Sequence, residues 1–179
     1  MKIVIIGIQG AGKSTQGNLL SEKLGLPYLS TGHIFREMAK EKTPLGRYIK
    51  EVMTAGYLIP DDKTLEIVSD YLHRPEYAKG YIIDGFPRTT TQAEAFENGI
   101  DHVVYLKVSD EEAKKRLNLR NDGREDETPA ALNRRIESFH KFTEPVLDFY
   151  RAKDELFEVN GEKTIEDINK EILEKINVR

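Results

Sequence analysis

Gly7, Gly12, Lys13 and Ser14 stand near the start of the chain in the spacing G-x-x-x-x-G-K-S, which is the P-loop pattern. Glycines allow the backbone to curl so that its N–H groups point at phosphate oxygens, and a helix directly after them adds its positive N-terminal end. Lys13 can then reach the outer phosphates, and Ser14 can ligate magnesium. The pattern therefore favours a site for the phosphates of a nucleotide over a plain glycine-rich turn.

An aspartate and two arginines stand where further chemistry is expected. Asp84 ends the apolar run YIID, where its carboxylate could hold magnesium or the waters of the metal. Arg36 lies in STGHIFR after the second expected strand, and Arg88 lies in DGFPRTTTQ after the third. Because ligands of an open parallel sheet bind beyond the carboxyl ends of its strands, both arginines should stand beside the phosphate loop. They would form a fork for a second phosphate, separate from the triphosphate.

The elements that must position these residues alternate between strands and helices. Apolar runs predict strands at 2–6, 28–29, 81–83, 102–108 and 156–159. Periodicity and end signals predict helices at 14–24, from 33, at 45–54, 61–72 and 110–119, from 128, and at 164–176. Pro145 should kink or restart the helix that opens at 128, and 121–127 should be an exposed loop. This alternation predicts an α/β fold of the P-loop NTPase type, with about five parallel strands and helices on both faces.

Length and composition restrict the classes of protein that the chain can belong to. Its 179 residues suffice for one core and are too few for two ordinary domains. No apolar stretch approaches the roughly 20 residues that cross a bilayer, and the first strand leaves no room for a signal peptide, so we expect a cytoplasmic protein without a membrane partner. The absence of cysteine excludes disulfides and cysteine-ligated zinc. A net charge of −4 argues against binding to nucleic-acid polymers.

Several stretches, in this order and spacing, resemble the adenylate kinases and the related nucleoside monophosphate kinases. Besides the P-loop they are Thr31-Gly32, Arg36, GYLIPD at 56–61, DGFPRT at 84–89, Gln92, RLNLR at 116–120 and TEPVLDFY at 143–150. The resemblance runs along the whole chain. It implies one monomeric domain with a core at 1–29, 60–115 and 136–179, a monophosphate-binding segment at 30–59 and a short lid at 116–135.

The resemblance also implies a role for individual residues. The implied catalytic residues are Lys13, Arg88, Arg120, Arg124 and Arg135. ATP would be bound by Gly10, Ala11, Gly12, Lys13, Ser14, Thr15, Arg116, Arg120 and Lys163. AMP would be bound by Thr31, Arg36, Tyr57, Leu58, Ile59, Gly85, Phe86, Pro87, Arg88, Gln92, Arg124 and Arg135. Magnesium would be held by Ser14 and, through water, by Asp84, and no zinc is expected.

The implied activity is the reversible, magnesium-dependent transfer of the γ-phosphoryl group of ATP to AMP, giving two ADP. AMP is favoured as the acceptor because Thr31 stands where the pyrimidine-preferring branch usually has alanine. A kinase for UMP or CMP is the first alternative. A P-loop hydrolase or switch is the second, although it would have no use for a fork of two arginines. A kinase for a sugar or acid alcohol would need a base near the acceptor hydroxyl.

Two positions depart from the pattern of the family. His33 stands where the family usually has an aspartate close to the waters of the magnesium. The lid sequence NDGRED at 121–126 is very short and has no room for a long insertion. Its arginines remain, so we expect the lid to close. How well it shields the donor base, and therefore how strictly ATP is preferred over other triphosphates, is left open by the sequence.

Overall fold

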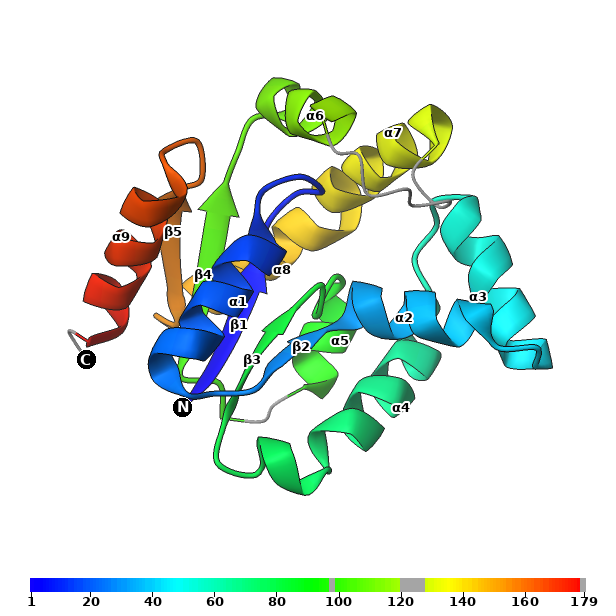
Figure 1. The fold of residues 1–179 in the computed structure, drawn as a ribbon, viewed down its shortest axis with the longest axis horizontal. Helices are drawn as coiled ribbons and strands as arrows, with labels where there is room; N and C mark the ends of the chain where they lie inside the picture. The colour runs from blue at the N-terminus through cyan, green and yellow to red at the C-terminus, as the bar shows by residue number, and fades with distance from the viewer. Residues whose placement is uncertain (97–98, 120–127, 178–179) are drawn as a thin grey trace.

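A single parallel sheet organises the structure, a computed structural model that describes residues 1–96, 99–119 and 128–177 (Figure 1). Within these residues the sheet has five strands in the order β2-β3-β1-β4-β5, and every neighbouring pair is parallel. The strands are β1 (Lys2–Ile6), β2 (Tyr28–Ser30), β3 (Tyr81–Asp84), β4 (His102–Lys107) and β5 (Leu156–Asn160). The predicted α/β fold is therefore confirmed.

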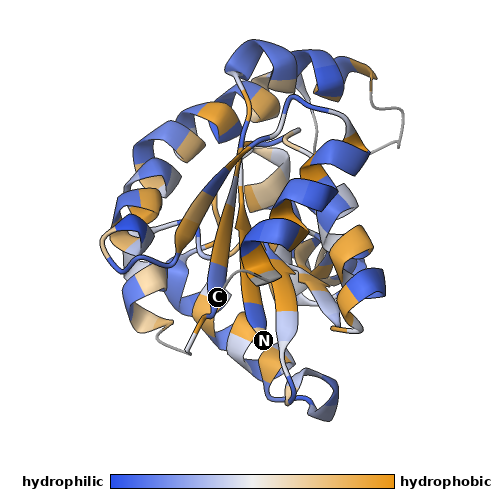
Figure 2. Cartoon of the chain, turned by 90° about the vertical axis from the view of Figure 1, so that its left-hand side faces the viewer, coloured by the Kyte–Doolittle hydropathy of each residue, from blue (hydrophilic) through white to orange (hydrophobic). Residues whose placement is uncertain are grey.

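Helices lie against both faces of this sheet, whereas α3, α6 and α7 lie beyond its carboxyl edge (Figure 1). In Figure 2 the apolar strands run between helices whose outward sides are hydrophilic. The helices α1 and α9 contact each other, whereas α5 contacts both α4 and α8. The bounds are α1 (Lys13–Leu24), α2 (Thr31–Lys40), α3 (Pro44–Thr54), α4 (Asp61–Leu72), α5 (Thr90–Ala95), α6 (Asp110–Leu119), α7 (Pro129–Ser138), α8 (Glu144–Arg151) and α9 (Ile165–Asn177).

The core explains why β1, β3 and β4 lie at the centre of the sheet. The central strands β1, β3 and β4 are built from β-branched and other apolar residues, and Ile3, Val4, Ile5, Ile82, Ile83 and Val103 have no exposed surface. Strands covered on both faces need such continuous apolar runs. In the register, Ile5 pairs with Asp84, and Asp84 pairs with Ser30. The carboxyl ends of β1, β2 and β3 therefore meet at one edge.

Residues with hydroxyl side chains are the N-caps of several helices. Ser30 caps α2, which starts at Thr31, two residues before the start predicted at position 33. Thr43, Thr89 and Thr128 accept backbone N–H bonds in the same way at the starts of α3, α5 and α7. Such a cap satisfies a helical N–H that would otherwise have no partner. Of these caps, Ser30 and Thr89 fix where the chain turns into a helix after β2 and after β3, at the carboxyl edge of the sheet.

Three local features differ from the sequence prediction or refine it. The short helix α5 and a 3₁₀ turn at Pro75–Tyr77 were not predicted. Before Pro145 the chain forms a π-helical turn, Phe139–Thr143, that joins α7 to α8. The α-helix restarts at Glu144 with Pro145 in its first turn, so the predicted kink or restart is a restart. The predicted loop at 121–127 lies outside the described residues.

Candidate active site

The P-loop curls between β1 and α1 and carries Lys13 at the start of the helix. Gly10 and Gly12 have φ angles of 89° and 92°, which only glycine adopts readily. The Lys13 ammonium donates to the carbonyl oxygens of Gly7 at 2.8 Å and Ile8 at 2.9 Å. The side chain thus folds back over the loop instead of extending into solvent. This geometry places one cation over the loop, as phosphate binding requires.

Asp84 lies at the centre of the carboxyl edge and is held by two hydroxyl groups. Its Oδ2 accepts from the Tyr28 hydroxyl at 2.8 Å and from the Ser14 hydroxyl at 3.4 Å, and the residue is 3 % exposed. The Tyr28 ring occupies space left by Gly17, where an added Cβ would lie 2.3 Å from the ring. Burial, followed by the charge of Asp84, raises the pKa of Tyr28. Tyr28 therefore remains a neutral donor that orients the carboxylate.

The oxygen atoms of Ser14 and Asp84 suit a hard cation. Magnesium is usually held by one or two protein oxygens together with water and substrate phosphates. Within the part of the chain that the structure describes, no cluster of three or more His, Cys, Asp or Glu side chains is placed to hold a metal on its own. The residues therefore fit a magnesium ion that a bound nucleotide helps to hold.

Two adjoining cavities open beside this edge of the sheet. The first lies between the P-loop and the loop after β3 and is lined by Gly7, Lys13, Phe86 and Pro87 among others. The second lies between α2, the end of α3 and the loop after β3, and it is lined by Arg36, Tyr57, Ile59 and Gln92 among others. Residues that line both cavities include Gln9, Leu58, Gly85, Arg88 and Arg135. The P-loop lysine and the predicted acceptor residues thus meet across a wall that contains two arginines.

Arg88 is a largely buried cation of this wall. Its Nε donates to the carbonyl oxygen of Gly85 at 2.7 Å, and the carbonyl oxygen of Arg88 accepts from the hydroxyl of Thr143 at 2.9 Å. Burial, with the charges of Arg135 and Arg36, lowers the pKa of Arg88 to about 10, and Asp84 opposes this change. Arg88 therefore keeps its charge at neutral pH. A buried cation held among like charges is well suited to an anionic ligand.

The two residues predicted to contact the acceptor base occupy different positions. Gln92, 2 % exposed, lies on the wall of the second cavity, and its amide bonds to Asp61 and to the backbone of Arg88. Thr31 has no exposed surface, and its hydroxyl donates to the carbonyl oxygen of Asp84 at 3.2 Å. In this structure Thr31 supports the loop after β3, and its contact with a base stays a prediction.

The helix α7 closes the second cavity from the opposite side. Arg135 donates to the carbonyl oxygen of Met53 at 3.0 Å, and Arg134 donates to that of Ala55. The guanidinium of Arg134 also lies 4.5 Å from the centre of the Tyr57 ring, a cation–π distance. Two adjacent arginines thus join α7 to the C-terminal end of α3, where the partial negative charge of the helix end attracts cations.

Other predicted site residues lie apart from the cavities or outside the described residues. Arg116 pairs with Glu112 at 2.8 Å on α6, and Lys163 pairs with Glu171 at 2.8 Å. Neither lines the two cavities described above, so their contacts with ATP stay predictions. Arg120 and Arg124 lie outside the described residues. His33 is exposed on the first turn of α2.

Sequence reasoning missed three residues of the site. Tyr28, Asp61 and Arg134 all bond to site residues or to the segments that enclose the site. Asp61 was visible only as the last residue of GYLIPD, and Arg134 only as the neighbour of Arg135. No pattern within the sequence assigns a partner to Tyr28.

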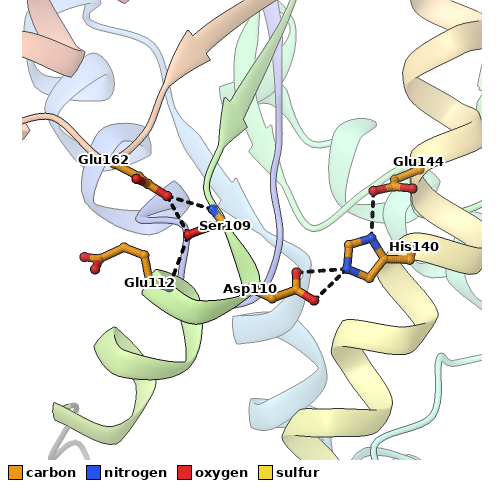
Figure 3. A network of polar contacts seen from close by, with 6 residues as sticks. All are labelled: Ser109, Asp110, Glu112, His140, Glu144 and Glu162. Carbon is orange, nitrogen blue, oxygen red and sulfur yellow. Dashed lines mark hydrogen bonds and ion pairs between the residues drawn. The ribbon is translucent and has the colours of Figure 1, made fainter.

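A polar network joins α6 to the turn between α7 and α8 (Figure 3). His140 bonds through Nε2 to Asp110 at 2.9 Å and through Nδ1 to Glu144 at 2.7 Å. Beside it, the carboxylate of Glu162 accepts from the backbone N–H and the hydroxyl of Ser109. The hydrogen bond to Glu144, followed by that to Asp110, raises the pKa of His140. A protonated His140 donates to both carboxylates at once.

We expect His140 to stabilise the fold in a pH-dependent way. Its pKa is higher in the folded chain than in the unfolded chain, so the contribution is fully present below the ordinary histidine pKa of about 6.5. The contribution is lost as the pH rises through the folded pKa. The difference in melting temperature between the wild type and His140→Gln should therefore be larger at about pH 5.5 than at about pH 8.5. The side chain is 43 % exposed, so the effect is small, and an equal difference at both pH values would contradict this role.

A family model described as adenylate kinase matches residues 5–155, which include the P-loop, Asp84, both cavities and the arginines of α7. The chain belongs to the adenylate kinase family. A relative named adenylate kinase from Cyanothece sp. is 37 % identical over 180 residues, with 96 % of this chain and 92 % of the relative covered. Relatives of the same name from Bacillus velezensis and Archaeoglobus fulgidus are 36 % and 37 % identical, with 97 % and 98 % of this chain and 97 % and 99 % of the relatives covered.

The alignments with these members of the adenylate kinase family also bear on chain length. Those with the Bacillus velezensis and Archaeoglobus fulgidus proteins extend over 210 and 215 residues, although this chain has 179. Such relatives therefore carry inserted residues that this chain lacks. The family resemblance predicted from the sequence motifs is confirmed.

Proposed function

We propose that the chain transfers the γ-phosphoryl group of ATP to AMP, reversibly, giving two ADP. Membership of the adenylate kinase family supports this activity. The single observation that carries the proposal is the shared wall of the two cavities. Arg88 and Arg135 stand between the P-loop on one side and Arg36 and Gln92 on the other. A group passing between two nucleotides would lie against this wall.

The chemistry needs no general base. The second pKa of a phosphate monoester is about 6, so an oxygen of AMP is already anionic near neutral pH. This oxygen forms a bond to the γ-phosphorus of ATP while the bond from that phosphorus to the β,γ-bridging oxygen breaks. The electron pair of the broken bond stays on the bridging oxygen, which leaves as part of the β-phosphate of ADP. The chain contributes positioning and positive charge from Lys13, Arg88 and Arg135. Magnesium, held by Ser14 and by Asp84 through water, would neutralise charge on the phosphates of ATP.

Exclusion of water is the second task of the site, because water could otherwise take the phosphoryl group. We assign this task to the monophosphate-binding segment at 30–59 and the short lid at 116–135. The hydrogen bonds from Arg134 and Arg135 to the end of α3 support closure by contact between the two. Closing only around two bound nucleotides would limit hydrolysis.

The acceptor base should be recognised more strictly than the donor base. A site that bonds one base leaves its own buried polar groups without partners when another base binds, at about 1–3 kcal/mol for each group. We therefore expect kcat/KM for AMP to exceed that for CMP or UMP by about 100-fold at fixed ATP. ATP and GTP at fixed AMP should differ less, because a stacking arginine such as Arg116 accepts any flat base. Measuring diphosphate formation over the full matrix tests both statements.

The same assays separate the alternatives. If kcat/KM for CMP or UMP equalled that for AMP, a pyrimidine monophosphate kinase would replace this proposal. Phosphate released from ATP alone, without stimulation by any monophosphate, would indicate a hydrolase.

Among the described helices none is long and apolar enough to cross a membrane. We further propose that the protein is a cytoplasmic monomer that acts on ATP, AMP and ADP. Gel filtration tests the oligomeric state.

A further inference from the structure

Asp61 makes a pair of hydrogen bonds that the phosphoryl transfer itself does not need. It is the first residue of α4, and its Oδ1 accepts from the Thr89 hydroxyl at 2.9 Å and from Gln92 Nε2 at 2.8 Å. Thr89 in turn caps α5 by accepting from the backbone N–H of Gln92. One carboxylate oxygen thus fixes both the side chain of Gln92 and the helix that carries it.

The amide of Gln92 is fixed from both ends. The backbone N–H of Arg88 donates to Gln92 Oε1 at 2.7 Å, while Nε2 donates to Asp61. A backbone N–H can only donate and a carboxylate can only accept, so both partners demand the same orientation of the amide. One N–H of Gln92 remains for a ligand. A flipped amide would place two donors together at Arg88 and two acceptors together at Asp61.

The wall that carries Gln92 also contains a hydroxyl whose proton is used within the chain. Thr64 lines the same cavity, and its hydroxyl donates to the carbonyl oxygen of Ile59 at 3.2 Å. Its oxygen therefore has only acceptor capacity left. The wall offers an acceptor from Thr64 and a donor from Gln92. The edge of adenine offers the complementary pair, an amino donor at position 6 and an acceptor nitrogen at position 1.

We infer that Asp61 sets the base preference of the acceptor site by holding Gln92 with an N–H toward position 1 of the purine. This inference rests on the proposed AMP kinase activity. Hypoxanthine differs from adenine at these two positions, with an oxygen acceptor at position 6 and an N–H at position 1. Against the fixed wall, the oxygen at position 6 of hypoxanthine would face the acceptor of Thr64, and its N–H at position 1 would face the donor of Gln92. Neither group would form a hydrogen bond. Asp61 is a positioning residue, because it acts on the base through Gln92.

Asp61→Ala tests the inference by freeing the amide. We expect the ratio of kcat/KM for AMP to that for inosine monophosphate to fall tenfold or more, mainly through a higher KM for AMP, with KM for ATP unchanged. Asp61→Asn should keep most of the ratio, because its carbonyl oxygen can accept from both partners. Asp62→Ala is the matched control, since it removes an exposed carboxylate from the same helical turn, and it should keep the wild-type ratio.

A double-mutant cycle with Gln92→Ala separates positioning from a structural role. When Asp61→Ala is added to Gln92→Ala, it should cause no further change in the ratio of kcat/KM for AMP to that for inosine monophosphate. An unchanged ratio in Asp61→Ala, or full additivity in the cycle, would overturn the inference. If circular dichroism shows that Asp61→Ala does not fold, Asp61→Ser provides the same test, because serine suits a helix start and is one bond shorter.

Calorimetry measures the affinities for AMP and for inosine monophosphate without turnover, and their ratio tests the same preference. A wild-type chain that bound AMP in preference but did not phosphorylate it would contradict the proposed function. The inference about Asp61 would then stand if Asp61→Ala abolished the binding preference. Equal binding of both monophosphates by the wild type would overturn it.

Discussion

Lys13→Ala should lower phosphoryl transfer by about 10²–10³ or more while the fold survives, because a fixed positive charge at the transferring group stabilises the transition state by about 3–4 kcal/mol. Lys13 is folded over the P-loop by the carbonyl oxygens of Gly7 and Ile8 and lines the same cavity as Arg88. No other residue of the P-loop carries a side-chain charge, so the loop itself has no second cation to replace Lys13. Initial rates of ADP formation at saturating ATP and AMP measure the effect.

Lys23→Ala is the matched control for this substitution. Lys23 is an exposed lysine on the last turn of the same helix, α1, and its removal should leave the rate unchanged. Circular dichroism of Lys13→Ala should match that of the wild type. Nearly normal turnover in a folded Lys13→Ala variant would rule out the assigned role.

Arg88→Ala should damage the use of AMP far more than the binding of ATP. The guanidinium is buried beside Gly85 and lines the acceptor cavity with Arg36. Removing one partner of a buried charged pair costs about 2 kcal/mol or more, so KM for AMP should rise roughly thirtyfold. Calorimetric titration of ATP and of AMP, each alone, separates the two effects.

Two further variants sharpen the result for Arg88. Arg88→Lys keeps the charge but loses the planar fork, so it should recover only part of the affinity for AMP. Arg47→Ala removes an exposed arginine from α3 and should leave both affinities unchanged. Equal weakening of ATP and AMP in Arg88→Ala would place Arg88 outside the acceptor site.

The sheet could be predicted from the sequence because its strands are continuous apolar runs separated by helical periods. The 3.6-residue pattern likewise indicated most helices, with boundaries within a few residues. The helix α5 was missed because its six residues, TTQAEA, carry too few apolar positions for a period. Its start depends on the Thr89 hydroxyl, and that hydroxyl is also bonded to Asp61, 28 residues away.

The site was predicted where a local motif carries the function and missed where the partner is remote in sequence. The P-loop, Asp84 and Arg88 stand in contiguous strings. By contrast, Tyr28 bonds to Asp84 across 56 residues, and Arg134 bonds to Ala55 across 79 residues. Those contacts exist only once the sheet order and the approach of α7 are known. The contact of Thr31 with the acceptor base stays a prediction, and in this structure the Thr31 hydroxyl donates to the carbonyl oxygen of Asp84.

The contact between α7 and the end of α3 bears on how fast products leave. Arg134 and Arg135 hold the carbonyls of Ala55 and Met53, and a Cβ added at Gly56 would lie 2.7 Å from the carbonyl oxygen of Ala131. Two ADP molecules enclosed between these segments can depart only when the segments separate. Each catalytic cycle then breaks and remakes the same few hydrogen bonds, and we expect this opening, rather than bond making at phosphorus, to set the ceiling on turnover.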